Sequence, residues 1–165
     1  MKNIHKILLL VLGLALVVSV SLKTPVFVFS PAKAELKSKE TITTGVVLRG
    51  KESLLKKVAV IDIKVEYDRS KLKLISAEPG TFFPVPLKAK WDEENAVFSL
   101  ATLLKGENRI ILNSQKEGEI IKLVFQVRES TGKTKISFAK ATSAYLLEKG
   151  KLKARFADAV YVIVK

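Results

Sequence analysis

Hydrophobic and polar residues alternate along much of this chain, which is the pattern of strands that have one buried face. Lys57–Tyr67 (KVAVIDIKVEY) shows it most clearly, because every second residue from Ile61 onward is apolar. The opposite face of this segment carries Asp62, Lys64 and Glu66. Glu119–Val127 has the same alternation, so both segments are predicted to be strands that line a core.

Shorter apolar runs predict the remaining strands. We expect them at Val26–Ser30, Thr41–Leu48, Leu72–Ala77, Leu87–Trp91, Ala96–Leu103, Lys135–Ala141 and Ala157–Val164. Turn residues separate most of them, at Arg49-Gly50, Glu78-Pro79-Gly80, Glu117-Gly118, Thr131-Gly132 and Lys149-Gly150. One short helix is expected at Ser143–Leu147. The pattern predicts an all-β chain that forms a single jelly-roll or immunoglobulin-like sandwich of about nine strands.

The first residues have the pattern of an export segment. Lys2 and Lys6 precede the apolar run Ile7–Val20, which is short for a helix that spans a membrane in about 20 residues. The small residues Ser19 and Ser21 predict cleavage after Ser21, and an uncleaved signal anchor is the alternative. We therefore divide the chain into a signal peptide or anchor (1–22) and one domain (23–165), and expect a secreted or cell-surface protein.

Composition removes most enzyme classes from consideration. The chain has no cysteine, and its one histidine, His5, lies within the export segment. Disulfide scaffolds, Cys-containing zinc sites, thiol nucleophiles and imidazole bases therefore have no residues in the domain. We expect no catalytic residue, no metal and no cofactor.

The positive charge has two interpretations. Without Lys2 and Lys6, 27 basic residues face 16 acidic ones, a balance that favours anionic partners. The lysines are scattered singly, however, without the basic blocks and interleaved aromatics of nucleic-acid binders. We interpret most of them as solubilising residues on exposed strands, and expect no nucleic-acid partner and no membrane contact beyond an uncleaved export segment.

A turn sequence follows the strand that ends at Tyr67. EYDRSKLKL (66–74) leads into AEPG (77–80) and then Phe82-Phe83. Asp68 is suited to accept N–H groups of Ser70 and Lys71 as an Asx-turn does, and Gly80 is suited to the positive φ of a type II turn after Pro79. These residues have structural roles whatever family the chain belongs to.

In order and spacing, this stretch resembles the signature of the cohesin domain. Such domains have a strand that ends in Tyr-Asp, a turn, a Leu-containing strand and a Pro-Gly turn followed by an aromatic residue. The resemblance continues through Val97–Ala101 and Glu117–Val127, and covers nearly all of the domain. It implies a non-catalytic sandwich of nine strands that binds a dockerin module on one sheet face, with calcium belonging to the dockerin.

The resemblance also implies a contact face. Val60 and Asp62 match the two positions of the dockerin-contact strand, with Val60 in place of an amide, and Thr102 stands where an acidic residue is expected. The residues expected on this partner-binding face are Asp62, Lys64, Glu66, Thr102 and Leu104.

Two other functions stay open. A carbohydrate-binding module that acts on polysaccharide would use Trp91, the only Trp, to stack against a sugar, and would need it exposed beside other aromatics. A polysaccharide-active enzyme, the less favoured alternative, would need two carboxyl groups about 5–9.5 Å apart in a cleft. The partner is therefore predicted to be a protein or a polysaccharide.

Overall fold

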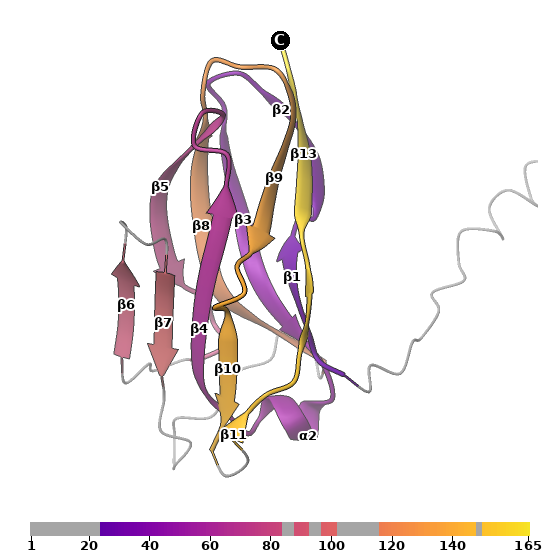
Figure 1. Cartoon of the computed structure of the whole chain (residues 1–165), viewed down its shortest axis with the longest axis vertical. Coiled ribbons are helices and arrows are strands. Elements are labelled where there is room, and N and C mark those ends of the chain that lie inside the picture. Colours follow the sequence, from indigo (N-terminus) through magenta and orange to yellow (C-terminus); the bar gives the residue numbers. More distant parts are fainter. Residues whose placement is uncertain (1–23, 84–87, 93–96, 102–115, 148–149) are drawn as a thin grey trace, which may run out of the picture.

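The computed structural model describes residues 24–83, 88–92, 97–101, 116–147 and 150–165, and these form a sandwich of two β-sheets (Figure 1). The first sheet has the order β12-β1-β3-β8-β5. Its strands are β12 (Arg155–Ala157), β1 (Val26–Ser30), β3 (Thr41–Arg49), β8 (Glu117–Val127) and β5 (Leu72–Pro79). The predicted all-β sandwich is confirmed.

The second sheet has the order β11-β10-β4-β9-β13-β2, and β7 joins β6 to the other edge of β4. Its strands are β11 (Gly150–Lys151), β10 (Ser143–Leu146), β4 (Val58–Tyr67), β9 (Gly132–Phe138), β13 (Ala159–Val164), β2 (Lys33–Lys37), β6 (Lys88–Asp92) and β7 (Val97–Ala101). A helix of one turn, α2 (Glu52–Leu55), covers one end of the sandwich.

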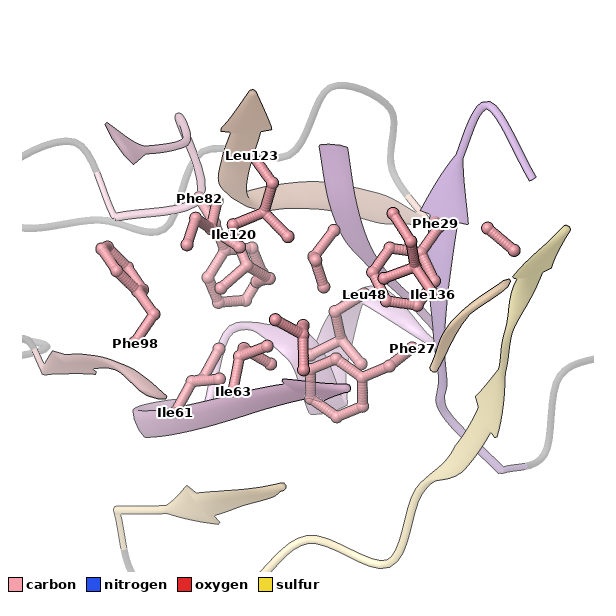
Figure 2. Close-up of a cluster of buried hydrophobic side chains, with 14 of the residues drawn as sticks. Phe27, Phe29, Leu48, Ile61, Ile63, Phe82, Phe98, Ile120, Leu123 and Ile136 are labelled. Atoms are coloured by element: carbon pink, nitrogen blue, oxygen red, sulfur yellow. The ribbon is translucent and has the colours of Figure 1, made fainter. Parts of the chain in front are cut away.

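The core lies between the sheets and is lined by the apolar positions of the alternating strands. Figure 2 shows side chains from both sheets that converge on it, among them Phe27, Leu48, Ile61, Ile63 and Leu123. All five are buried. Because burial of a large apolar side chain stabilises a fold by about 1.5–3 kcal/mol, this shared interior is the main force that joins the sheets.

One buried hydrogen-bond pair also links the two sheets. Tyr161 of β13 donates its hydroxyl to the Pro31 carbonyl oxygen at 2.8 Å, and the same hydroxyl is hydrogen-bonded to the Thr44 hydroxyl of β3 at 3.0 Å. Burial raises the pKa of the Tyr161 phenol, and the bond with Thr44 opposes that rise. The phenol therefore stays neutral and satisfies a polar side chain that the fold has taken from water.

Two segments cover the same edge of β4 in succession. β10 pairs with its first half, at Val58–Asp62, and β9 pairs with Val65–Tyr67. Between them the Thr142 side chain replaces the ladder: the Lys64 N–H donates to its Oγ1 at 3.1 Å, and its hydroxyl donates to the Lys64 carbonyl oxygen at 2.9 Å. Thr142 thus satisfies the main-chain N–H and carbonyl of Lys64 at the point where neither β10 nor β9 pairs with β4.

The structure corrects two predictions about local structure. Ser143–Leu146 forms strand β10 rather than the expected helix, because its main chain pairs with β4 on one side and β11 on the other. Gly80 does not adopt a positive φ. Among the described glycines, only Gly132 and Gly150 do. Gly80 is needed for a different reason: a Cβ there would lie 2.4 Å from the Glu119 carbonyl oxygen.

Strand number also differs from the expected nine. The last predicted strand, Ala157–Val164, is interrupted at Asp158, where the chain passes from β12 in the first sheet to β13 in the second. β2 and β11 are further short strands, and α2 was not predicted. The export segment lies outside the described residues, and within them no helix is long and apolar enough to cross a membrane.

The turn after β4 is built as the sequence predicts. The Asp68 carboxylate accepts the Ser70 hydroxyl and the Ser70 N–H, the latter at 2.9 Å, and Lys71 N–H donates to the Asp68 carbonyl oxygen at 3.1 Å. The two bonds from Ser70 to the carboxylate, first that from its hydroxyl and then that from its N–H, hold the pKa of Asp68 below its ordinary value of 3.8. The Tyr67 ring packs edge-on against Phe125, with centroids 5.1 Å apart.

We expect Thr142→Val to destabilise the fold by about 1–3 kcal/mol, because it keeps the side chain's shape but leaves the partly buried Lys64 N–H without its acceptor. Urea unfolding measures the change. Thr43→Val, at an exposed position of β3, is the matched control and should stay within about 0.5 kcal/mol of the parent. Equal changes in the two variants would contradict the role of Thr142.

We expect Ser70→Ala to raise the pKa of Asp68 toward its ordinary value, because the largest cause of the lowered pKa is the Ser70 hydroxyl. An NMR titration of the Asp68 carboxyl measures it. A lowered pKa in the fold stabilises the fold above the unfolded pKa, and this contribution is lost as pH falls through the folded pKa. Ser70→Ala should therefore weaken the acid sensitivity of the turn, and an unchanged Asp68 titration would refute this account.

Candidate binding face

The outer surface of β6, β7, β4 and β10 is the candidate site, and we call it the β4 face. Its position follows from the alternation of β4. Ile61, Ile63 and Val65 are buried in the core, so the residues between them point outward on the opposite side of the sheet. The outward residues of β4 are Val60, Asp62, Lys64 and Glu66.

Cross-strand register arranges the β4 face in rows. Asp62 pairs with Ser143 of β10 on one side and with Ser99 of β7 on the other, and Ser99 pairs in turn with Lys90 of β6. Residues paired in this way project from the same side of a sheet. Asp62, which is half-buried, therefore lies between two serine side chains, of which Ser99 is half-buried and Ser143 is buried.

The neighbouring row is more apolar. Val60 pairs with Tyr145 of β10 and with Ala101 of β7. Tyr145 is 40% exposed, whereas Val60 and Ala101 are half-buried. A tyrosine beside small apolar groups and next to a carboxylate is the kind of surface that protein interfaces use, because Tyr offers apolar area and a hydrogen-bonding tip.

The structure brings together three of the predicted contact residues. Asp62, Lys64 and Glu66 lie along the outer side of β4, with Lys64 and Asp62 half-buried and Glu66 exposed. Thr102 and Leu104 lie outside the described residues. Trp91 lies in β6 opposite Phe98 of β7, and its side chain is outside the described part of the structure.

Sequence reasoning missed Ser143 and Tyr145, because it assigned their segment to a helix. The signal was present but short. Ala144 and Leu146 are buried while Tyr145 is exposed, which is the alternation of a strand. Four residues are too few to separate that period from a helical one, since the pairing that decides it is with β4, far away in the chain.

A hollow of about 510 Å³ adjoins the β4 face at the end of β4. Its lining includes Glu66, Asp68, Lys133 and Lys135. Lys135 is paired with Asp158 at 2.7 Å, and the Asp68 carboxylate is taken up by Ser70. The general acid of a glycosidase needs a raised pKa, whereas the pKa of Asp68 is lowered, so Asp68 does not suit the role of general acid.

Metal ligands are also scarce where the structure is described. Across these residues, no group of three or more His, Cys, Asp or Glu side chains is placed to hold an ion.

Solved cohesins share this architecture. A cohesin from the archaeon Archaeoglobus fulgidus, described as non-cellulosomal, superposes with a TM-score of 0.65 at 13% identity, over 86% of this chain and 92% of that one. A type I cohesin from Pseudobacteroides cellulosolvens superposes with a TM-score of 0.67 at 18% identity, over 86% of this chain and 92% of that one. The match with a type I cohesin–dockerin complex from Clostridium thermocellum has a TM-score of 0.64 at 16% identity, and covers 86% of this chain and 99% of that one.

Sequence comparison points the same way. No curated protein matches the chain. The family model of the cohesin domain, however, matches residues 27–162, which include every strand of the sandwich from Phe27 of β1 to Val162 of β13. The sandwich that carries the β4 face is thus the one that the family model describes, and this chain belongs to the cohesin domain family.

Proposed function

We propose that this protein is a non-catalytic recognition module that works outside the cytoplasmic membrane and captures a dockerin-type protein partner on its β4 face. The observation that carries the proposal is the composite surface around Asp62. Several cohesins of the same fold were solved as complexes with dockerins, including ones from Clostridium thermocellum and Acetivibrio cellulolyticus. The family therefore supplies the class of partner.

The β4 face supplies the chemistry of recognition. Along β4 the charge alternates in sign from Asp62 through Lys64 to Glu66, so a partner must place complementary groups at matching intervals. The row of Val60, Ala101 and Tyr145 offers apolar area directly beside Asp62. We infer that Tyr145 and Val60 act as apolar anchors and that the charges select the partner.

Rigidity favours this face over other surfaces. β4 is bonded along one edge to β7 and along the other to β10 and β9, with Thr142 closing the interruption. A face held on both edges keeps its side chains in place before binding, which reduces the entropy lost on association. Thr102 and Leu104 follow β7 in sequence, and we keep them as proposed contacts.

Export is part of the proposal. Residues 1–22 have the pattern of a signal peptide or signal anchor, and we propose that they carry the domain (23–165) across the membrane. N-terminal sequencing of the exported protein distinguishes the two fates. Leu22 as the first residue supports cleavage, and retained Met1 supports an anchor.

We expect Asp62→Lys to weaken dockerin capture at least about tenfold, because it places a cation where the partner's donors must approach a carboxylate. Biolayer interferometry against purified dockerin modules from secreted proteins of the same source measures the affinity. Glu78→Lys makes the same change of charge on exposed β5 of the other sheet, and should leave capture unchanged.

Two outcomes would contradict the proposal. Equal affinity of Asp62→Lys and the parent protein would remove the β4 face as the binding site. Binding to insoluble polysaccharide, lost in Trp91→Ala and without capture of any dockerin module, would instead assign the chain to the carbohydrate-binding alternative.

A further inference from the structure

One end of the sandwich bears α2, and we call it the α2 end (Figure 1). Exposed basic residues are concentrated there. It comprises residues 24–26, 49–58, 116–117, 144–147 and 150–155. Seven of its basic side chains are exposed: Lys51, Lys56, Lys57, Lys116, Lys151, Lys153 and Arg155. The main chain brings them together, since Lys57 bonds to Leu147 and Arg155 bonds to Pro25.

Carboxylates at the α2 end do not cancel this charge. Among its described residues the acids are Glu52 and Glu117. Glu52 is paired with Lys56, and Glu117 accepts a hydrogen bond from Arg49 at 2.7 Å. Among the described residues of the α2 end, basic side chains therefore outnumber acidic ones, which gives this part of the surface a net positive field toward solvent.

An exposed leucine projects from the same end. Leu147 is 57% exposed, the largest value among the described large hydrophobic side chains. Its N–H donates to the Lys57 carbonyl oxygen at 3.0 Å, so its main chain is fixed next to the cations. Basic residues around an exposed apolar side chain are typical of proteins that rest on a membrane surface.

The position of the N-terminal segment decides which surface lies nearby. Pro25, at the start of the described chain, is joined to the α2 end: its carbonyl oxygen accepts the Arg155 N–H at 2.8 Å, and its Cβ lies next to Gly50. The apolar run Ile7–Val20 ends only a few residues earlier. A bilayer that holds this run, before or without its removal, therefore faces the α2 end.

Charge by itself does not single out the α2 end. The opposite end is also basic, with exposed Lys37, Arg128 and Lys133 among others. That end is separated from the start of β1, where the described chain enters the sandwich, by the length of the strands (Figure 1). The α2 end differs from the opposite end in two respects: the described chain enters the sandwich there, and it carries the exposed Leu147. The opposite end therefore serves as a matched comparison.

The sequence alone gives no reason to expect membrane contact beyond the export segment. Resting on the proposed export through that segment, we propose that the α2 end docks on an anionic lipid bilayer, through Lys51, Lys151, Lys153 and the neighbouring cations, with Leu147 at the interface. A domain docked in this way stands with its strands directed away from the bilayer and its β4 face turned sideways, accessible to a partner. Each basic residue near an anionic surface contributes roughly a fivefold gain in the docking equilibrium.

The test uses the full chain reconstituted in vesicles. Because the sequence has no cysteine, Ser53→Cys on α2 and Thr131→Cys at the opposite end each give a single labelling site, and both positions are exposed. A fluorophore at each site is quenched by a quencher carried on the lipid. We expect quenching of the residue-53 label in vesicles containing phosphatidylglycerol, its loss in pure phosphatidylcholine or at high salt, and no quenching of the residue-131 label.

Charge reversal separates docking from general attraction. The triple variant K51E/K151E/K153E should reduce the docking equilibrium roughly 100-fold or more, as three contributions of this size imply. K37E/R128E/K133E makes the same change of charge at the opposite end, and should retain quenching at residue 53.

Three results would overturn the proposal. Equal quenching of the residue-53 label in anionic and in neutral vesicles would mean that the N-terminal tether alone, and not the basic residues, keeps the α2 end near the bilayer. Equal losses in the two triple variants would mean attraction by net charge without an oriented surface. In the third result, a soluble polyglycerol phosphate displaces the domain from the bilayer and binds the α2 end in preference to vesicles. This would assign the α2 end to an anionic polymer.

Discussion

The structure depends on the burial of alternate residues of β4. Ile61, Ile63 and Val65 are buried against the opposite sheet, and a shift of register by one residue would exchange them for charged side chains. The same constraint therefore fixes the core and the chemistry of the outer surface. Asp62, Lys64 and Glu66 are displayed outward because their neighbours must face inward.

Much of the fold could be predicted because long strands carry a strong period of two. β4 and β8 were identified from alternation, and the turn at Asp68 from local side-chain chemistry. β10 was not, since four residues cannot show a period and its pairing depends on the distant β4. Gly80 was recognised as special for the wrong reason, because the close approach of the Glu119 carbonyl is a tertiary contact.

The candidate site was predictable to the same extent as its strands. Alternation in β4 placed the three charged positions on one face, whereas the row of Val60, Ala101 and Tyr145 needed the pairing of three strands to be known. The meaning of the positive charge changes with position. Exposed lysines on strand faces are interpreted as solubilising residues, whereas those of the α2 end gather near the start of β1, where the described chain enters the sandwich.

We propose above all that a protein partner binds the outer face of the sheet that contains β4. Methyl cross-saturation NMR with a bound dockerin module tests this most directly, because it reports which side chains touch the partner. We expect attenuated signals for Val60 and Ala101, and unchanged signals for Val28 and Val124 on the outer side of the other sheet. Attenuation of Val28 and Val124, with Val60 and Ala101 unchanged, would contradict it.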